Sequence, residues 1–553
     1  MKSYRSMAQC VAALLFMHTI AAAPAIGQTV TGEIRGTVRD SSGGVLPGVT
    51  VTATHTQTGL KRSETTGATG SYVLPSLPIG GYVVTAELQG FRKAEKTGFE
   101  LRPDGRVTAD FTMSIGALTE TVTVEASRGD TVNRTSGEVS RIVDGETVRS
   151  LALSGRNYLE LASLIPGAVM LDDDQMAVTT GLGTAGTVIN GNRGNSNNLT
   201  VDGGFNLDSG SNSSMINNVG IDFIDQVSIQ TSNFAADKGR NAGASINVVT
   251  RSGTNQYGGS VFTTYRNDRF HAANHFAPRD ANGKKIKAKE VFNDPGGGFG
   301  GPIIRNKLFF FGGVEFKSLD RQESPLLRLL PTRAELNGDF NARILGPDGV
   351  AGTADDNGIA NSLINPATGQ AFPGNVIPQN LITADGRAIA KVYERMIGLA
   401  ATYTDAPIAN NTVFQLDFPF DWRQDLARID YRPSKAHSFY MRYLHDKYDL
   451  IEPRGTFIGS PMPTIPTNRI RPGYGIQLSH TWIARQNLFN DFKATSSWNG
   501  QRIPPAGDNW RRDTYGFQFP QVFDRGRFDV DGIPRISFSG TGAPAEIIGP
   551  SGS

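Results

Sequence analysis

Beyond Tyr257 the chain contains long segments in which apolar and polar residues alternate. In the segment from Tyr474 to Trp482, one face carries Tyr, Ile, Leu, His and Trp, and the other carries Gly, Gln, Ser and Thr. An alternation with a period of two is typical of a β-strand that has one apolar face. Further segments of this kind begin at Gly258 and at Lys307. The second half of the chain is therefore expected to form long amphipathic strands.

Two kinds of protein contain such strands. In a membrane-spanning β-barrel the apolar side faces lipid and the polar side faces a wet lumen, and aromatic residues such as Tyr474 and Trp482 lie at the two membrane interfaces. A strand of a soluble β-sandwich alternates in the same way. No segment approaches the ~18 consecutive apolar residues of a helical span. That absence leaves a barrel open, because a barrel strand needs only about ten residues.

The first 27 residues are typical of a signal peptide. Lys2 and Arg5 precede an apolar stretch, and small residues lie just before Gln28. The apolar stretch is shorter than the ~20 residues of a membrane anchor. Cleavage would remove Cys10, the only cysteine, and would reduce the 54 basic residues to 52, equal to the 52 acidic ones. The mature chain is thus expected to lack disulfides and thiolate metal sites, and its zero net charge gives no support for nucleic-acid binding.

Residues 28–116 contain short β-rich runs separated by turn signals. Glycine accounts for 64 of the 553 residues and only 19% of residues are charged, which suits many short strands better than a helical bundle. The run from Val49 to Thr54 alternates, and others begin at Gly32, Gly70 and Gly80 and extend from Val107 to Met113. This succession predicts a small β-sandwich.

The motifs in this region resemble the carboxypeptidase regulatory-like domain. They are Gly36-x-Val38-x-Asp40, Pro47-Gly48-Val49, Gly70-x-Tyr72, Leu77-Pro78-x-Gly80-Gly81-Tyr82 and Gly90-Phe91. The resemblance implies an immunoglobulin-like sandwich of seven strands. A zinc carboxypeptidase would need a His followed three residues later by Glu, and none of the seven histidines has Glu there. The module is therefore expected to be a structural or interaction unit.

Residues 137–255 resemble the plug domain of TonB-dependent receptors. Short capped helices are expected at 144–148 and 154–161. The motifs that follow are Leu161-x-x-Leu164-Ile165-Pro166-Gly167, Gly191-Asn192-Arg193, Val201-Asp202-Gly203 and Ile246-Asn247-Val248-Val249-Thr250-Arg251-Ser252-Gly253. The form Asn190-Gly191-Asn192-Arg193-Gly194 resembles the Oar-like subgroup. The resemblance implies a plug inside an outer-membrane barrel, to which residues 256–553 contribute.

The linker 117–136 carries a candidate partner contact. Its residues are Glu120, Thr121, Val122, Thr123 and Val124. Alternating β-branched residues in a flexible stretch can add as a strand to the sheet edge of another protein. The same pattern fits the last strand of the sandwich. The position just ahead of the plug favours a resemblance to a TonB box, which implies contact with a TonB-type energy-transducing protein.

No catalytic, cofactor or metal site is expected. Gly181–Gly186 and Gly296–Gly301 fit Gly-x-Gly-x-x-Gly, but the first lies in a Gly-rich loop and Pro302 follows the second, so neither suits a dinucleotide site. The acidic loop 348–357 offers oxygen ligands without the spacing of an EF-hand, so a solvated loop explains it better. The nucleophile-elbow motif is absent, and no enzyme is expected.

The chain as a whole is expected to be mainly β, with an N-terminal immunoglobulin-like sandwich, an α/β plug and the first part of a large antiparallel transmembrane barrel in outer-membrane lipid. A barrel of this class has about 22 strands, more than the residues after Thr250 can supply, so the chain is expected to be C-terminally incomplete. The expected function is energised uptake of an unknown extracellular ligand. An adhesion or surface-assembly protein on the same barrel is the rival.

Long polar loops would face outside. Examples are 279–289 and 337–371, and the segments 338–340 and 372–378 resemble an extracellular loop signature of Oar-like receptors. Such loops fit a bulky ligand, for example a glycan or a peptide, better than a small metal chelate. The resemblance is the basis of this expectation.

Overall fold

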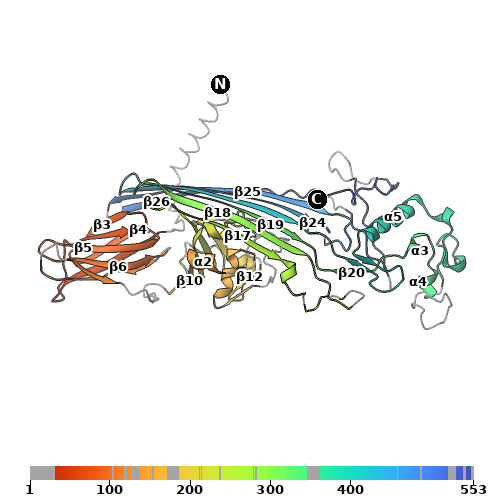
Figure 1. Ribbon diagram of the computed structural model, residues 1–553, viewed down its shortest axis with the longest axis horizontal. Helices are drawn as coiled ribbons and strands as arrows, with labels where there is room; N and C mark the ends of the chain where they lie inside the picture. The colour runs from red at the N-terminus through yellow and green to blue at the C-terminus, as the bar shows by residue number, and fades with distance from the viewer. Residues whose placement is uncertain are drawn as a thin grey trace, which may run out of the picture.

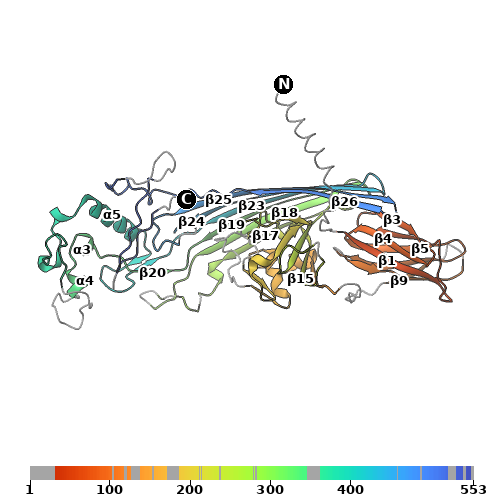
Figure 2. The ribbon, with the colours of Figure 1, turned by 180° about the vertical axis from the view of Figure 1, so that it is seen from behind.

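The computed structural model describes residues 31–549, with gaps at 103–104, 117–120, 126–136, 152, 154, 171–185, 211, 213, 236–237, 274, 278, 280–282, 346–361, 457–458, 486–487, 521–530 and 540–542. Figure 1 shows a β-sandwich at one end of a long sheet, a middle domain packed against that sheet, and a group of helices at its far end. The reverse view in Figure 2 has the same arrangement. The expected signal peptide and Glu120 lie outside the described residues.

The N-terminal body is a two-sheet sandwich, as expected. Its strands are β1 (Thr31–Asp40), β2 (Thr50–His55), β3 (Lys61–Thr65), β4 (Ser71–Pro78), β5 (Gly80–Glu87), β6 (Lys93–Leu101), β7 (Arg106–Thr108) and β8 (Phe111–Met113). One sheet has the order β4-β1-β7 with β8 also on β1, and the other has the order β3-β2-β5-β6 followed by β9 (Thr121–Glu125). The alternation in β2 buries Val51 and Ala53 in the core between the sheets.

One expected strand of the sandwich is divided in two. The run from Val107 to Met113 forms β7 and β8, which both pair in parallel with β1 and are separated by Ala109 and Asp110. Ala109 is buried there, and its carbonyl accepts a hydrogen bond from the Tyr72 hydroxyl (2.6 Å). Counted as one interrupted strand, β7 and β8 make seven strands with β1 to β6, the number that the resemblance implies, and β9 is added to them as an eighth.

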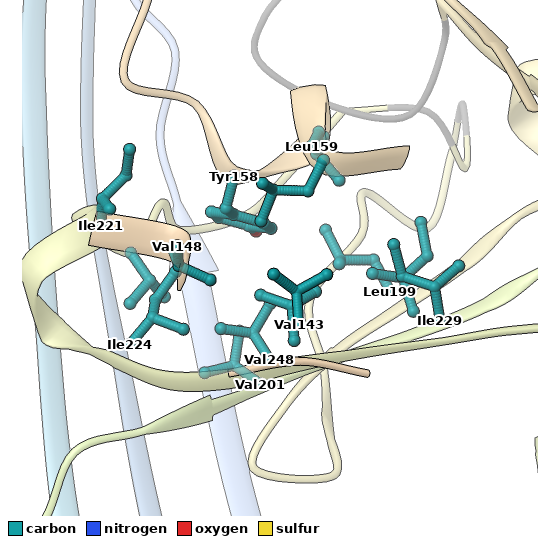
Figure 3. Packing of buried hydrophobic residues seen from close by; sticks show 14 of the residues in the cluster. Val143, Val148, Tyr158, Leu159, Leu199, Val201, Ile221, Ile224, Ile229 and Val248 are labelled. Carbon is teal, nitrogen blue, oxygen red and sulfur yellow. The ribbon is translucent and has the colours of Figure 1, made fainter. Parts of the chain in front are cut away.

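The middle domain has its own sheet and core. Its elements are β10 (Val139–Asp144), α2 (Gly145–Ser150), η1 (Tyr158–Leu164), β11 (Ala168–Met170), β12 (Thr187–Ile189), η3 (Gly194–Ser196), β13 (Asn198–Val201), β14 (Gly204–Phe205), η4 (Ile221–Phe223), β15 (Ile224–Ser232) and β16 (Ser245–Thr250). The sheet order is β10-β15-β16-β13-β14, with β13 parallel to β16. Figure 3 shows Val143, Val148, Tyr158 and Leu199 among the side chains that fill the core.

Both expected helices of this region exist, with one change. Asp144 caps α2 by accepting a hydrogen bond from the backbone N–H of Thr147 (2.8 Å). The second helix is a 3₁₀ helix that begins at Tyr158, and its cap is Asn157, further along than the expected start at Ser154. It ends at Leu164, before Pro166 and Gly167, as expected.

The long sheet contains seven strands, and all neighbouring strands are antiparallel. They are β17 (Gly258–Asn267), β18 (Glu290–Ile304), β19 (Leu308–Arg321), β23 (Phe420–Tyr431), β24 (His437–Glu452), β25 (Thr467–Arg485) and β26 (Leu488–Asn499), in that order. Gly296–Gly301 lies inside β18, so that motif is a strand and not a turn that opens a helix. No helix in the described part of the chain is long and apolar enough to cross a membrane.

The connection between β19 and β23 folds as a unit at the far end of the sheet. It contains β20 (Leu326–Arg328), α3 (Arg333–Leu336), α4 (Asn341–Leu345), η7 (Pro373–Asn375), η8 (Gln379–Leu381), α5 (Ala384–Gly398), β21 (Thr402–Tyr403) and β22 (Thr412–Phe414). Val392 and Tyr393 of α5 share a core with Phe517 and Ile547. The two loop-signature segments meet here, because the Ile377 N–H donates to the Gly338 carbonyl (2.8 Å).

Candidate functional site

The two faces of the long sheet have opposite character. In β25 the polar positions Gln477 and Ser479 are buried, whereas Tyr474, Leu478 and Trp482 are 40–48% exposed. Across the exposed face, aromatic rings stack between strands: His437 lies on Trp482 and Phe439 on His480, with centroids 6.2 and 4.2 Å apart. The face that the sequence predicted to be apolar therefore points outward, and the polar face points to the middle domain.

The middle domain packs directly on the polar, inner face of the long sheet. Its core includes Phe311, Leu426 and Leu444 from three strands of that sheet. Gly313 of β19 allows a close approach, because a Cβ there would lie 2.2 Å from the ring of Phe223. A side chain at Gly313 would push η4 away from the sheet wall.

A buried ion cluster centred on Asp202 joins the two bodies. Asp202 belongs to the turn after β13 and is fully buried. Its carboxylate lies 2.6 Å from Arg442 Nη1 of β24 and 3.5 Å from Arg428 Nη1 of β23. The N–H and the hydroxyl of Thr250 also donate to it, at 2.9 and 2.8 Å. Burial alone would raise the pKa of Asp202, but these guanidiniums and hydrogen bonds hold the pKa below its usual value.

A second buried cluster surrounds Arg156, which lies just ahead of η1. Arg156 forms ion pairs with Asp222 of the middle domain and with Asp294 of β18 (2.7 Å), and Glu315 of β19 lies 3.6 Å away. Lys317 supplies a second cation, 3.4 Å from Glu315. The Lys317 ammonium also donates to the carbonyl of Arg156 (3.3 Å). The two clusters attach the middle domain at two separate places on the sheet.

Both clusters hold carboxylates against guanidinium or ammonium groups in a largely buried contact, which attaches the two bodies electrostatically. Among the described residues, no group of three or more His, Cys, Asp or Glu could hold a metal ion. The sequence analysis named Asp202 only as part of the Val201-Asp202-Gly203 motif and did not single out Arg156, Arg428 or Arg442. The signal that could have found Arg442 is its place among the inward positions of an alternating strand.

The predicted partner-contact residues lie on the sandwich. Thr121, Val122, Thr123 and Val124 form most of β9, which pairs in parallel with β6 from Lys93↔Thr121 to Thr97↔Glu125. β9 is the last strand of the five-stranded sheet. The interpretation as a final sandwich strand therefore describes the backbone of this segment. A role as a partner contact stays a prediction.

The sandwich is seated on the end of the long sheet through the turn after β2. The Asn255 N–H donates to the Gln57 carbonyl (3.0 Å), and Asn255 exchanges two hydrogen bonds with Asn306 of the β18–β19 turn (2.7 and 2.8 Å). Gly59 of the same turn has a φ of 67°, and a Cβ there would lie 2.4 Å from Asn306 Oδ1. The turn therefore needs glycine for both its conformation and its close approach.

His55, the last residue of β2, lies next to this turn and is a buried neutral histidine. Nε2 faces the carbonyl of Ile79 (2.9 Å) and therefore donates, while Nδ1 accepts from the Thr58 N–H (3.2 Å). Burial lowers the pKa of His55 to about 4, the Ile79 carbonyl opposes this, and the positive charge of Arg432 adds to the lowering. The surroundings of His55 therefore favour the neutral form of its imidazole ring.

We expect the sandwich to lose stability as the pH falls. The pKa of His55 is about 6.5 in the unfolded chain and about 4 in the fold, so the unfolded state binds more protons below pH 6.5. The stabilisation is complete above pH 6.5 and is lost towards pH 4, by about 3 kcal/mol in all. Pulse proteolysis in urea at several pH values measures this loss. His55→Gln should flatten the pH dependence, and an identical slope in that variant would contradict the assignment.

An antiparallel sheet with an exposed apolar outer face, and a polar inner face covered by a folded domain, has the features of a membrane-spanning β-barrel wall. The chain belongs to the outer membrane beta-barrel domain family, which matches residues 249–552. Residues 33–114 match the carboxypeptidase regulatory-like domain. The family match places the chain in the outer membrane.

The chain is similar to a curated protein, the TonB-dependent transporter Oar of Myxococcus xanthus, with 30% identity over 307 residues. The match covers 51% of this chain and 26% of the relative, so the chain spans about a quarter of the relative's length. Two solved structures match the chain with low TM-scores. They are the outer membrane transporter YddB from Escherichia coli (11% identity, TM-score 0.39, 65% of this chain and 38% of that one) and the siderophore receptor PirA from Acinetobacter baumannii (12%, 0.31, 66% and 44%).

Proposed function

We propose that this protein takes up a bulky ligand across the outer membrane with energy from a TonB-type protein. In this proposal the middle domain, residues 137–255, is the plug, and residues 120–124 are the contact with the energy-transducing partner. The ligand first meets the folded connection between β19 and β23. No nucleotide or metal is needed at this protein.

The observation that carries the proposal is the attachment of the middle domain to the barrel wall. Asp202 and Arg156 form ion pairs with Arg442 and Asp294 on the wall strands β24 and β18; the first pair is fully buried, and in the second Asp294 is buried while the Arg156 side chain is 13% exposed. Charged contacts of this kind regain hydration when they separate, which offsets part of the cost of parting them. A polar, ion-paired contact therefore suits a plug that must be held firmly and still be moved by force.

A pocket at the far end of the barrel supports the proposal that the ligand is bulky and polar. The pocket is lined by Asp268, His271, Phe276, Lys287 and Glu290, which combine an aromatic ring with charges of both signs. Saccharides and peptides present hydroxyl, amide or charged groups that such a lining can bind. We propose a glycan or a peptide as the ligand class.

The test is energy-dependent accumulation of labelled ligands. Cells with and without the gene would receive a panel of labelled oligosaccharides and peptides, each with and without a protonophore. We expect at least one compound to accumulate only in cells that carry the gene, and the protonophore to abolish that accumulation without abolishing surface binding. Accumulation that is equal in both strains for every compound would overturn the proposal.

The rival is an adhesion or surface-assembly protein on the same barrel. The large folded connection with its own core, which includes Val392 and Phe517, is the feature that favours it. Loss of cell–cell contact in the deletion strain, with unchanged uptake of every compound, would support adhesion. The same two strains therefore separate the two functions.

A further inference from the structure

The predicted partner-contact strand lies at the edge of the sandwich. β9 is the terminal strand of its five-stranded sheet, and β6 occupies one of its two edges through five residue pairs. Within the described part of the chain, no strand pairs with the other edge of β9. A bare edge of extended backbone is a template on which another chain can add a strand.

The sandwich that carries β9 is itself fixed to the barrel. Its turn at Gln57–Gly59 contacts Asn255, where the middle domain joins β17, and Asn306, where β18 turns into β19. β9 therefore belongs to a body that is attached to the barrel, and it lies at the edge of its sheet opposite β3. A strand that is already ordered costs a partner less conformational entropy on binding than a flexible peptide does.

The order of the chain places β9 between the sandwich and the middle domain. Residues 126–136 lead from its C-terminal end to β10, which begins at Val139. A force applied to β9 acts first on its pairing with β6, because the sandwich is attached to the barrel and resists being pulled. Only after β9 separates from β6 can the force reach the middle domain.

We propose that the energy-transducing partner adds an extended segment to the free edge of β9 and that pulling strips β9 from β6 before the plug moves. This rests on the proposed function and specifies how its partner contact operates. The sandwich is then a platform that presents the contact as a preformed strand. It also sets a mechanical threshold, because weak pulling leaves the pairing of β9 with β6 in place.

A reversible crosslink tests both parts of the proposal. Thr97 and Glu125 are paired between β6 and β9, just beyond the contact residues, so Thr97→Cys with Glu125→Cys can join the strands between the contact and the plug. Cys10 is the only cysteine of residues 1–553, and its loss with the signal peptide would leave no other thiol in residues 28–553. The matched control is Thr52→Cys with Ser63→Cys, a pair on β2 and β3 whose hydroxyls lie 2.9 Å apart.

The measurements are binding of the purified periplasmic domain of the cell's TonB-type protein and uptake by intact cells, each before and after oxidation. We expect the oxidised Thr97/Glu125 variant to keep partner binding and to lose uptake, and a reductant to restore uptake. The oxidised control should keep both. Loss of partner binding on oxidation would show that the partner competes with β6 instead of adding to β9. Unchanged uptake would show that β9 need not separate.

The remaining outcomes also test the proposal. Failure of the Thr97/Glu125 disulfide to form in the membrane-embedded protein, while the control disulfide forms, would overturn the placement of β9 on β6. Uptake that survives removal of residues 120–126 would refute the partner contact itself, which belongs to the proposed function. Uptake that is lost on that removal but survives the crosslink would refute only the stripping step.

Discussion

Replacing Asp202 by alanine is expected to weaken the attachment of the middle domain to the barrel wall by about 3–5 kcal/mol, the usual cost of leaving a buried ionic partner unpaired. Arg442 is 2% exposed and lies 2.6 Å from the lost carboxylate. Arg428 keeps Asp430 at 3.0 Å, so Arg442 loses more than Arg428 does. Thr250 also loses the acceptor of two hydrogen bonds.

The measurement is hydrogen exchange of β15 and β16 at increasing urea concentrations in the detergent-solubilised protein. Asp202→Ala should lose protection at lower urea than the wild type. Adding Arg442→Met should recover part of the loss, because removing both charges leaves none buried alone. The control Asp513→Ala breaks an exposed pair with Arg511 and should change nothing measurable. A double variant no more stable than Asp202→Ala alone would argue against the pairing.

Removing residues 120–126 is expected to abolish uptake and to leave ligand binding intact. The deletion takes away the proposed partner contact, so no force reaches the middle domain. Ligand binding should persist, because the connection between β19 and β23 and the pocket residues between β17 and β18 lie at the end of the long sheet opposite to Asn306, near which the sandwich is attached. β9 is a terminal strand, so the remaining sandwich keeps its two sheets and its core.

Two comparisons make this result specific. A variant in which a Gly/Ser segment of the same length replaces residues 120–126 separates loss of the contact from shortening of the linker, and it should also be inactive. The amount of protein in the outer membrane and the binding of labelled ligand to whole cells should match the wild type in both variants. Normal uptake by either variant would remove residues 120–124 from the partner contact.

The properties that depend on local pattern were predictable. A period of two assigns alternate residues to opposite faces whatever the partner strand is, so the outward face of Tyr474 and Trp482 could be read from nine residues. The cap at Asp144 and the end of η1 before Pro166 follow from residues within one turn of each helix. The family motifs extended this local information to the identity of the N-terminal sandwich.

The properties that depend on contacts across the chain were not predictable. Asp202 and Arg442 are 240 residues apart in the sequence, and no motif near either residue indicates that the fold brings their buried side chains together. The division of the 107–113 run also depends on a distant contact, since β7 and β8 follow the path of β1. Likewise, the pattern of residues 120–124 fitted both a partner contact and the last strand of the sandwich, and only the pairing of β9 with β6 showed that the backbone joins the sandwich.

The sequence by itself determined that the chain is mainly β, which faces of its strands are apolar, and which families its parts resemble, because these follow from short-range periodicity and motifs. The tertiary structure alone decided how the parts are joined. Ion pairs at Asp202 and Arg156 hold the middle domain, the turn at Gly59 seats the sandwich, and β6 takes up the predicted partner strand. The physical reason is that the pairing of strands and the packing of the domains decide which charges are buried together and which strand edges are paired. A short stretch of sequence does not contain that information.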